Sequence, residues 1–172
     1  MNYWAATHTG WNPHVSGGWG QITDRAGTWS GDYCYMDSER VPCFGGTSYT
    51  LAADSLYYLH SGAGHCYTEM VWWDGAGNVL GQASGTAYVA NHDYSTTGGG
   101  RSIHKLTAAS PANAASVSAR LVHYKVGAAS VNVAGWRQVK LEQGSQMTAY
   151  SNEASVTTIA ETVTSVDGKA NQ

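Results

Sequence analysis

Gly45-Gly-Thr-Ser-Tyr-Thr-Leu-Ala-Ala-Asp54 is the stretch of the chain that decides the fold. A glycine pair typical of a turn stands directly before residues 48–53, which have the length and composition of a β-strand. Further strands are expected at residues 66–73, 117–124, 131–133 and 136–141, and glycine-rich turns at residues 74–78 and 94–100. Many short strands separated by such turns predict an all-β fold, a sandwich or jelly roll.

The composition fits one folded domain with few surface charges. The 172 residues are 42% hydrophobic, enough to build a core, and only 12% charged. The chain contains seven Trp and 11 Tyr but only one Phe. Trp and Tyr rings are suited to partly hydrated binding surfaces as well as to cores. The net charge of -3 and the scattered basic residues argue against a nucleic-acid partner. No apolar run approaches the ~20 residues of a membrane span, so we expect no membrane insertion.

The three cysteines are Cys34, Cys43 and Cys66. Their odd number, without CxxC or Cys/His metal spacing, argues against a disulfide scaffold and against a zinc site. We expect buried free thiols, and a single disulfide is the alternative.

Residues 147–172 are expected to form a linker and a short coiled-coil-like helix that follow a sandwich of residues 1–146. Val156, Ile159, Val163 and Val166 are spaced by three, four and three positions. This is the a/d pattern of a coiled coil, and β-branched residues at both positions favour three strands over two. The alternative is a terminal helix packed on its own sandwich.

Four motifs follow one another between residues 42 and 144. They are Gly45–Asp54, Val71-Trp-Trp-Asp-Gly-Ala-Gly-Asn-Val-Leu80, Ala108–Leu121 and Gln138-Val-Lys-Leu-Glu-Gln-Gly144. In this order they resemble carbohydrate-binding-module-like jelly rolls. The resemblance implies a galactose-binding-like jelly-roll β-sandwich, and residues 1–41 match it poorly.

The end of the chain carries a second resemblance. Leu141-Glu-Gln-Gly-Ser-Gln-Met-Thr-Ala-Tyr-Ser-Asn-Glu-Ala-Ser155, followed by the Val/Ile heptad, resembles tail-tip and host-specificity proteins (central tail fibres) of tailed bacteriophages. This implies a virion protein, a homotrimer within a larger tail protein, whose partner is a glycan or receptor on the host surface. Because no signal peptide opens the chain, we expect synthesis in the bacterial cytoplasm.

Many jelly rolls of this type hold a structural Ca²⁺, using an early acidic residue and an Asp just before the closing strand. The corresponding stretch here is Ala134-Gly-Trp-Arg-Gln138, which has no carboxylate. Because Ca²⁺ needs several oxygen ligands, we expect no metal and no other cofactor.

Strand alternation sorts the candidate ligand-binding residues, because neighbouring side chains point to opposite faces. Trp72, Leu121, Val139 and Leu141 belong to the sets expected to face the core. If the opposite faces share one concave sheet, that sheet carries Tyr67, Glu69, Trp73, Arg120, Tyr124, Trp136 and Gln138. Aromatic planes stack on sugar C–H faces, while carboxylate, amide and guanidinium groups pair with hydroxyls. Alternatively, Glu69 and Arg120 only form a cross-strand ion pair.

Catalytic signatures are missing from the sequence. It contains no GxSxG or HExxH motif and no evident carboxylate pair for glycoside hydrolysis. We therefore expect a non-enzymatic protein. Two functions stand: a binding module for a host glycan or receptor, or a trimer-forming tail spacer without a ligand.

Overall fold

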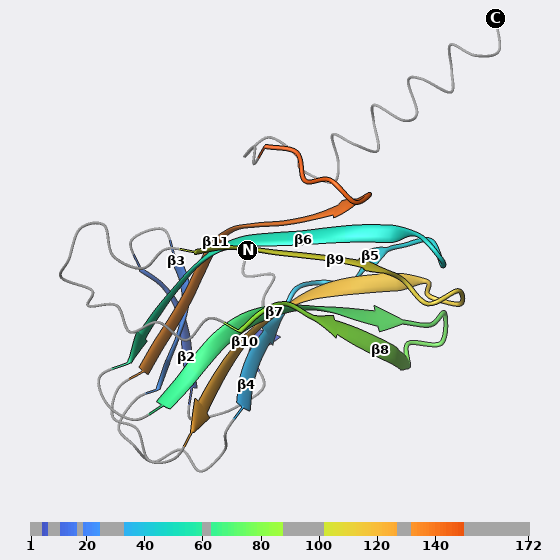
Figure 1. Cartoon of the computed structure of the whole chain (residues 1–172). Helices are drawn as coiled ribbons and strands as arrows, with labels where there is room; N and C mark the ends of the chain where they lie inside the picture. The colour runs from blue at the N-terminus through green and yellow to red at the C-terminus, as the bar shows by residue number, and fades with distance from the viewer. Residues whose placement is uncertain are drawn as a thin grey trace, which may run out of the picture.

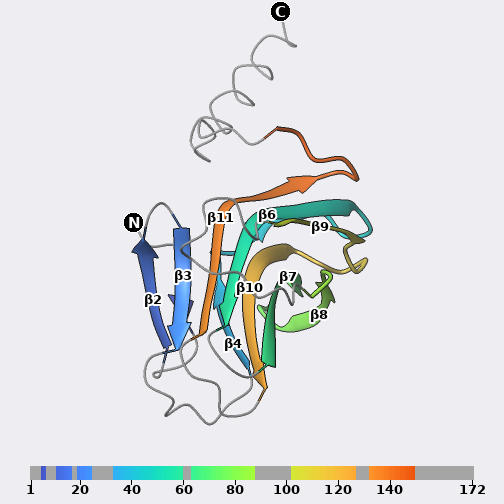
Figure 2. The ribbon, with the colours of Figure 1, turned by 60° about the vertical axis from the view of Figure 1, so that its left-hand side comes forward.

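The computed structural model describes residues 5–6, 11–16, 19–24, 33–59, 63–87, 102–126 and 132–149. Eleven strands form within these residues and pack as two antiparallel sheets, one on the other (Figures 1 and 2). The strands are β1 (Ala5–Ala6), β2 (Trp11–Ser16), β3 (Trp19–Asp24), β4 (Tyr33–Asp37), β5 (Val41–Pro42), β6 (Ser48–Leu59), β7 (Ala63–Trp73), β8 (Val79–Ser84), β9 (Ser102–Ala109), β10 (Ser116–Val126) and β11 (Asn132–Gln143).

Sheet A has the strand order β1-β4-β10-β7-β8, with β5 also paired to β10, and sheet B has the order β2-β3-β11-β6-β9. Both sheets bend, and the outer face of sheet A lies on the inner side of the bend (Figure 1). The predicted jelly-roll β-sandwich is confirmed. No helix in the described ranges has the length and hydropathy needed to cross a bilayer.

Two predicted features lie outside the described residues: the 94–100 turn, and the C-terminal helix with Val156, Ile159, Val163 and Val166. The coiled coil and the domain boundary after residue 146 therefore stay predictions. The predicted turn at residues 74–78 is confirmed: the carboxylate of Asp74 accepts hydrogen bonds from the backbone N–H groups of Ala76 at 2.9 Å and Asn78 at 2.8 Å. Hydrogen bonds from the Asn78 side chain and then its backbone lower the pKa of Asp74.

The core between the sheets consists of two hydrophobic clusters in the described part of the chain. One contains Cys34, Met36, Ala53, Cys66, Leu121, Ala134 and Trp136, and the other contains Cys43, Tyr49, Leu51, Met70, Trp72, Ala114, Val117 and Ala119. Val139 packs against both. The three cysteines are buried and form no disulfide, as the thiol interpretation predicted. Burial raises the pKa of the Cys66 thiol.

The last strand corrects the sequence analysis at one place. Residues 131–133 and 136–141 were expected as two strands, but β11 is continuous and contains a β-bulge. Its register on β6 steps from Arg137 opposite Asp54 to Lys140 opposite Ala52. Gln138 lies in this step and has a φ of 51°. Such a bulge inserts one residue and shifts the alternation of side chains beyond it.

Candidate functional site

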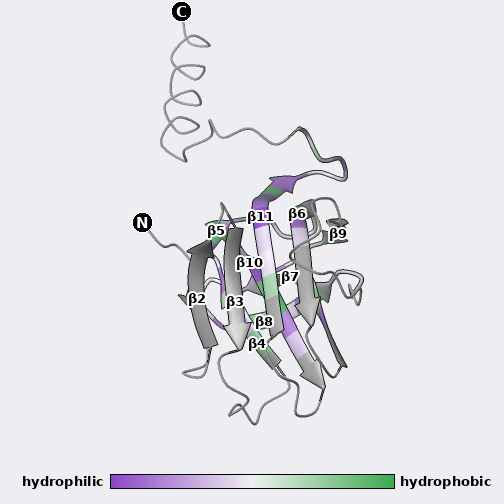
Figure 3. Ribbon diagram, turned by 90° about the vertical axis from the view of Figure 1, so that its left-hand side faces the viewer, coloured by the Kyte–Doolittle hydropathy of each residue, from purple (hydrophilic) through white to green (hydrophobic). Residues whose placement is uncertain are grey.

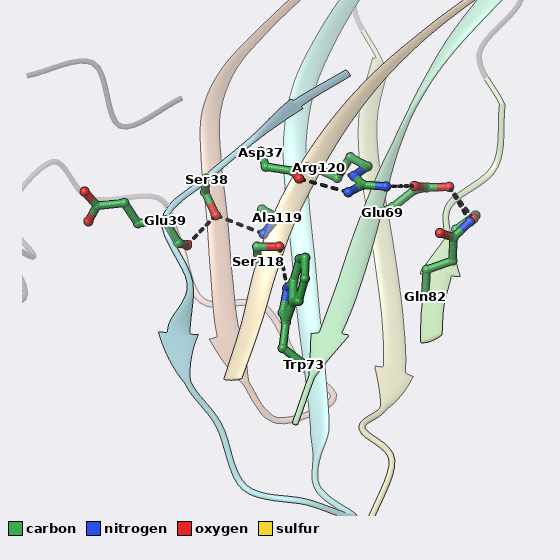
Figure 4. Close-up of polar contacts among 10 residues, drawn as sticks. Asp37, Ser38, Glu39, Glu69, Trp73, Gln82, Ser118, Ala119 and Arg120 are labelled. Carbon is green, nitrogen blue, oxygen red and sulfur yellow. Dashed lines mark hydrogen bonds and ion pairs between the residues drawn. The ribbon is translucent and has the colours of Figure 1, made fainter. Parts of the chain in front are cut away.

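The outer face of sheet A carries an ion-paired row of side chains that crosses its strands. Arg120 on β10 lies opposite both Asp37 on β4 and Glu69 on β7. Its Nε and Nη2 donate to the two carboxylate oxygens of Asp37 at 2.7 and 2.9 Å, and its Nη1 lies 4.0 Å from Glu69 Oε2 (Figure 4). The two-point pairing fixes the plane of the guanidinium.

Glu69 extends this row to the next strand, β8. Its Oε1 accepts hydrogen bonds from Ser84 Oγ at 2.8 Å and from Gln82 Nε2 at 3.3 Å. The Glu69 side chain is only 2% exposed, so these donors and Arg120 replace the water that a buried carboxylate loses. We call Asp37, Arg120, Glu69, Gln82 and Ser84 the polar row. It holds side chains from four strands in one fixed arrangement.

Two aromatic rings beside the polar row are each covered by a guanidinium. The Arg120 guanidinium carbon lies 3.7 Å from the ring centre of Tyr35, and that of Arg40 lies 3.5 Å from the ring centre of Trp73. The indole Nε1 of Trp73 donates to Ser118 Oγ at 3.1 Å. Each cation occupies one face of its ring, so a ligand that stacks on Trp73 must use the other face or displace Arg40.

A third group of rings lies further along the same face. His65 stacks on Tyr124 with ring centres 4.7 Å apart, and Tyr67 lies 5.6 Å from His65 at a tilt. Burial lowers the pKa of His65, which favours its neutral form at neutral pH. Together these rings add apolar surface beside the charged row.

The structure brings five of the seven predicted site residues onto this face: Tyr67, Glu69, Trp73, Arg120 and Tyr124. The predicted alternation is confirmed here, since Cys66, Thr68, Met70 and Trp72 are all buried on the opposite, inner face. The predicted Glu69–Arg120 cross-strand pair is also present. Part of this face is not accessible to solvent, because Glu69, Val71 and Val122 are buried.

Trp136 and Gln138 do not join this face, because β11 belongs to sheet B. The expected outward orientation of Trp136 is wrong: it is 1% exposed and lies in the core beside Ala134. The bulge explains the error, since Trp136 precedes it and Val139 follows it, and both therefore point inward. Gln138 is exposed on sheet B.

Sequence reasoning missed Tyr35, Asp37, Arg40, Gln82 and Ser84, which complete the face. Alternation alone would have put Tyr35 and Asp37 on one side of a strand, but nothing in the sequence pairs that strand with β10. In the described ranges, no group of three or more His, Cys, Asp or Glu side chains is placed to hold a metal ion.

Neither a protein-family model nor a curated protein sequence matches this chain. The solved structures that share its fold include the following three. A carbohydrate-binding module of family 4 is 14% identical over 83% of this chain and 95% of its own, with a TM-score of 0.52. The CBM22-1–GH10 modules of a Clostridium thermocellum endo-1,4-β-D-xylanase, complexed with xylohexaose, give 9% identity over 87% of this chain and a TM-score of 0.58.

The third is the enzymatically active domain of tailspike protein 4 of bacteriophage CBA120, 11% identical over 83% of this chain with a TM-score of 0.51. This chain spans 20% of that tailspike chain and 28% of the xylanase chain. At such identities the likeness shows the fold alone. The chain is thus a β-sandwich of the type found in carbohydrate-binding modules and in a phage tailspike.

Proposed function

We propose that this chain is a non-catalytic binding domain of a phage tail-tip or tail-fibre protein, and that it binds a glycan on the host surface through the outer face of sheet A. The observation that carries the proposal is the polar row beside Trp73. A carboxylate, an amide, a hydroxyl and a guanidinium are fixed next to an indole ring. Sugars are bound by this combination of hydrogen-bonding groups and a flat apolar surface.

Two further observations support this reading. The face lies on the inner side of the bend in sheet A (Figure 1), where an extended ligand contacts several strands at once. The carboxylates of Asp37 and Glu69 are both paired with Arg120. Both carboxylates are thus engaged by the same guanidinium rather than set apart as an acid and a base, which argues for binding rather than glycoside hydrolysis.

A glycan array with the fluorescently labelled domain tests the proposal. We expect binding to related glycans, and we expect Trp73→Ala to weaken it at least about tenfold, the loss typical of a central aromatic contact. Lys105→Ala, an exposed change on β9 of the opposite sheet, serves as the control and is expected to leave binding unchanged. If the Trp73→Ala variant binds glycans as strongly as the unchanged domain does, the glycan site lies elsewhere.

One observation favours a second function, a structural spacer without a ligand. The buried part of the sheet A face and the two guanidinium–ring stacks are also what a purely structural surface would show. If the domain binds no glycan on the array even when it is displayed at high density, the result favours the spacer function.

In either function, we propose that the chain acts as a homotrimer joined through Val156, Ile159, Val163 and Val166. Light scattering on a chain extended beyond Gln172 is expected to give three times the monomer mass. Ile159→Asp is expected to reduce the mass to that of a monomer, because a charge in the seam opposes association. A monomeric extended chain would contradict the trimer.

A further inference from the structure

A small pocket lies on the outer face of sheet B, on the opposite side of the sandwich from the polar row. It has a volume of about 180 Å³, and its lining includes Ala52, Asp54, Ile103, Gln138, Met147 and Thr148. It forms where the bulge in β11 separates that strand from the middle of β6. This volume is below the ~300–1,000 Å³ of sites for drug-sized ligands, so it suits a single sugar unit.

Asp54 lines this pocket and carries a hydrogen-bond acceptor that no group in the described residues uses. The residue is 9% exposed. Its Oδ2 accepts from Arg137 Nε at 2.6 Å, but its buried Oδ1 has no hydrogen-bond partner in the described part of the chain. A buried carboxylate oxygen is normally hydrogen-bonded. Because this oxygen is buried behind the pocket wall, a ligand reaches it only when the Asp54 side chain turns, and the ligand then gains most by bringing a donor to Oδ1.

The charges around the pocket indicate that this ligand is neutral. Arg137 is paired with Asp54, and Lys140 is paired with Glu142, with Nζ and Oε1 2.9 Å apart. Lys140 also donates to the side chain of Thr148 and to the Ala149 carbonyl. Figure 3 shows the hydrophilic end of β11 that carries this pair. Each of the two cations is paired with one carboxylate, so the four charges balance and an ionic ligand finds no net counter-charge here.

The remaining walls combine apolar surface with one exposed amide. Ile103 is 78% exposed, a large apolar side chain left open to solvent, and Ala52 and Met147 add further C–H surface. The exposed Gln138 is the non-glycine residue with a positive φ in the described ranges. Strained backbone of this kind concentrates at ligand sites. Gln138 lines the pocket, so its side-chain amide, which is both a donor and an acceptor, lies at the pocket's edge.

From these contacts we infer that the sheet B pocket binds the acetamido group of a neutral N-acetylhexosamine. The acetamido N–H donates to Asp54 Oδ1, and its methyl packs against Ala52, Ile103 and Met147. Its carbonyl accepts a hydrogen bond from the Gln138 side-chain amide. This site is separate from the polar row and does not depend on glycan binding by sheet A.

Titration of the ¹⁵N-labelled chain with N-acetylglucosamine and N-acetylgalactosamine, followed by amide chemical shifts, tests the site. We expect saturable shifts at the amides of Ala52, Asp54 and Ile103 with at least one of these sugars. Glucose and galactose, which lack the acetamido group, are expected to bind about tenfold more weakly, the effect of losing one well-placed hydrogen bond and its methyl contact.

Two variants locate the binding. Ile103→Ser removes an exposed apolar wall, and Gln138→Gly removes the amide at a φ that suits glycine, so both are expected to fold and to bind about tenfold more weakly. Trp73→Ala is expected to leave these shifts unchanged. The inference is overturned if neither acetamido sugar gives saturable shifts at these amides, or if glucose and galactose bind as well. It is also overturned if the shifts occur only on sheet A, a result that leaves the proposed sheet A function standing.

Discussion

Arg120→Met is expected to lower the free energy of unfolding by about 3 kcal/mol. Methionine keeps much of the apolar stem of Arg120 but removes the guanidinium that pairs with Asp37 and Glu69. The Glu69 side chain is 2% exposed, so its charge stays buried after its cation is lost, and this is the main source of the penalty. For a domain of this length, 3 kcal/mol lowers the melting temperature by roughly 6–12 °C.

Urea unfolding followed by tryptophan fluorescence measures this loss. Lys105→Met, an exposed change on β9, is the matched control and is expected to stay within about 0.5 kcal/mol of the unchanged domain. Adding Glu69→Gln to Arg120→Met removes the stranded charge and is expected to recover part of the stability, a coupling that independent sites do not show. A loss no larger than that of Lys105→Met would mean that the polar row does not stabilise sheet A.

The orientations predicted for β7 and β10 were right because they depend only on the two-residue period of an extended strand. Nothing interrupts that period between Cys66 and Trp72 or between Val117 and His123, where every residue expected to face the core is buried. Some residues of the outer face, such as Glu69, are buried as well. The core of sheet A and five candidate site residues could therefore be read directly from the sequence.

The same reasoning failed at Trp136 because a single inserted residue reverses the alternation. Gln138 carries no turn signal, and a left-handed glutamine has no sequence signature comparable to that of glycine. The membership of β11 in sheet B was equally invisible, because strand pairing is decided by contacts between distant segments. Asp37 and Arg120, for example, are 83 positions apart, so the counterion of Arg120 could not be identified from local pattern.

Gly45→Ala is expected to destabilise the domain by about 3 kcal/mol, through overlap with backbone that cannot move away freely. A Cβ at this position would lie 1.9 Å from the carbonyl oxygen of Ala112 and 3.0 Å from that of Pro111. The turn at residues 44–47 is held against this segment by Ser110, whose Oγ donates to the Phe44 carbonyl at 2.7 Å and whose N–H donates to the Thr47 carbonyl at 2.9 Å. Accommodating the methyl group must separate these partners.

Thermal unfolding of Gly45→Ala beside Gly75→Ala measures this effect. A Cβ at Gly75 meets no atom within 4 Å, so that variant controls for the general effect of replacing a turn glycine and is expected to change stability by less than about 0.5 kcal/mol. The difference between the two variants isolates the contact of the 44–47 turn with residues 110–112. Equal melting temperatures would mean that the turn can lift away at little cost, and that Gly45 is not needed for the start of β6.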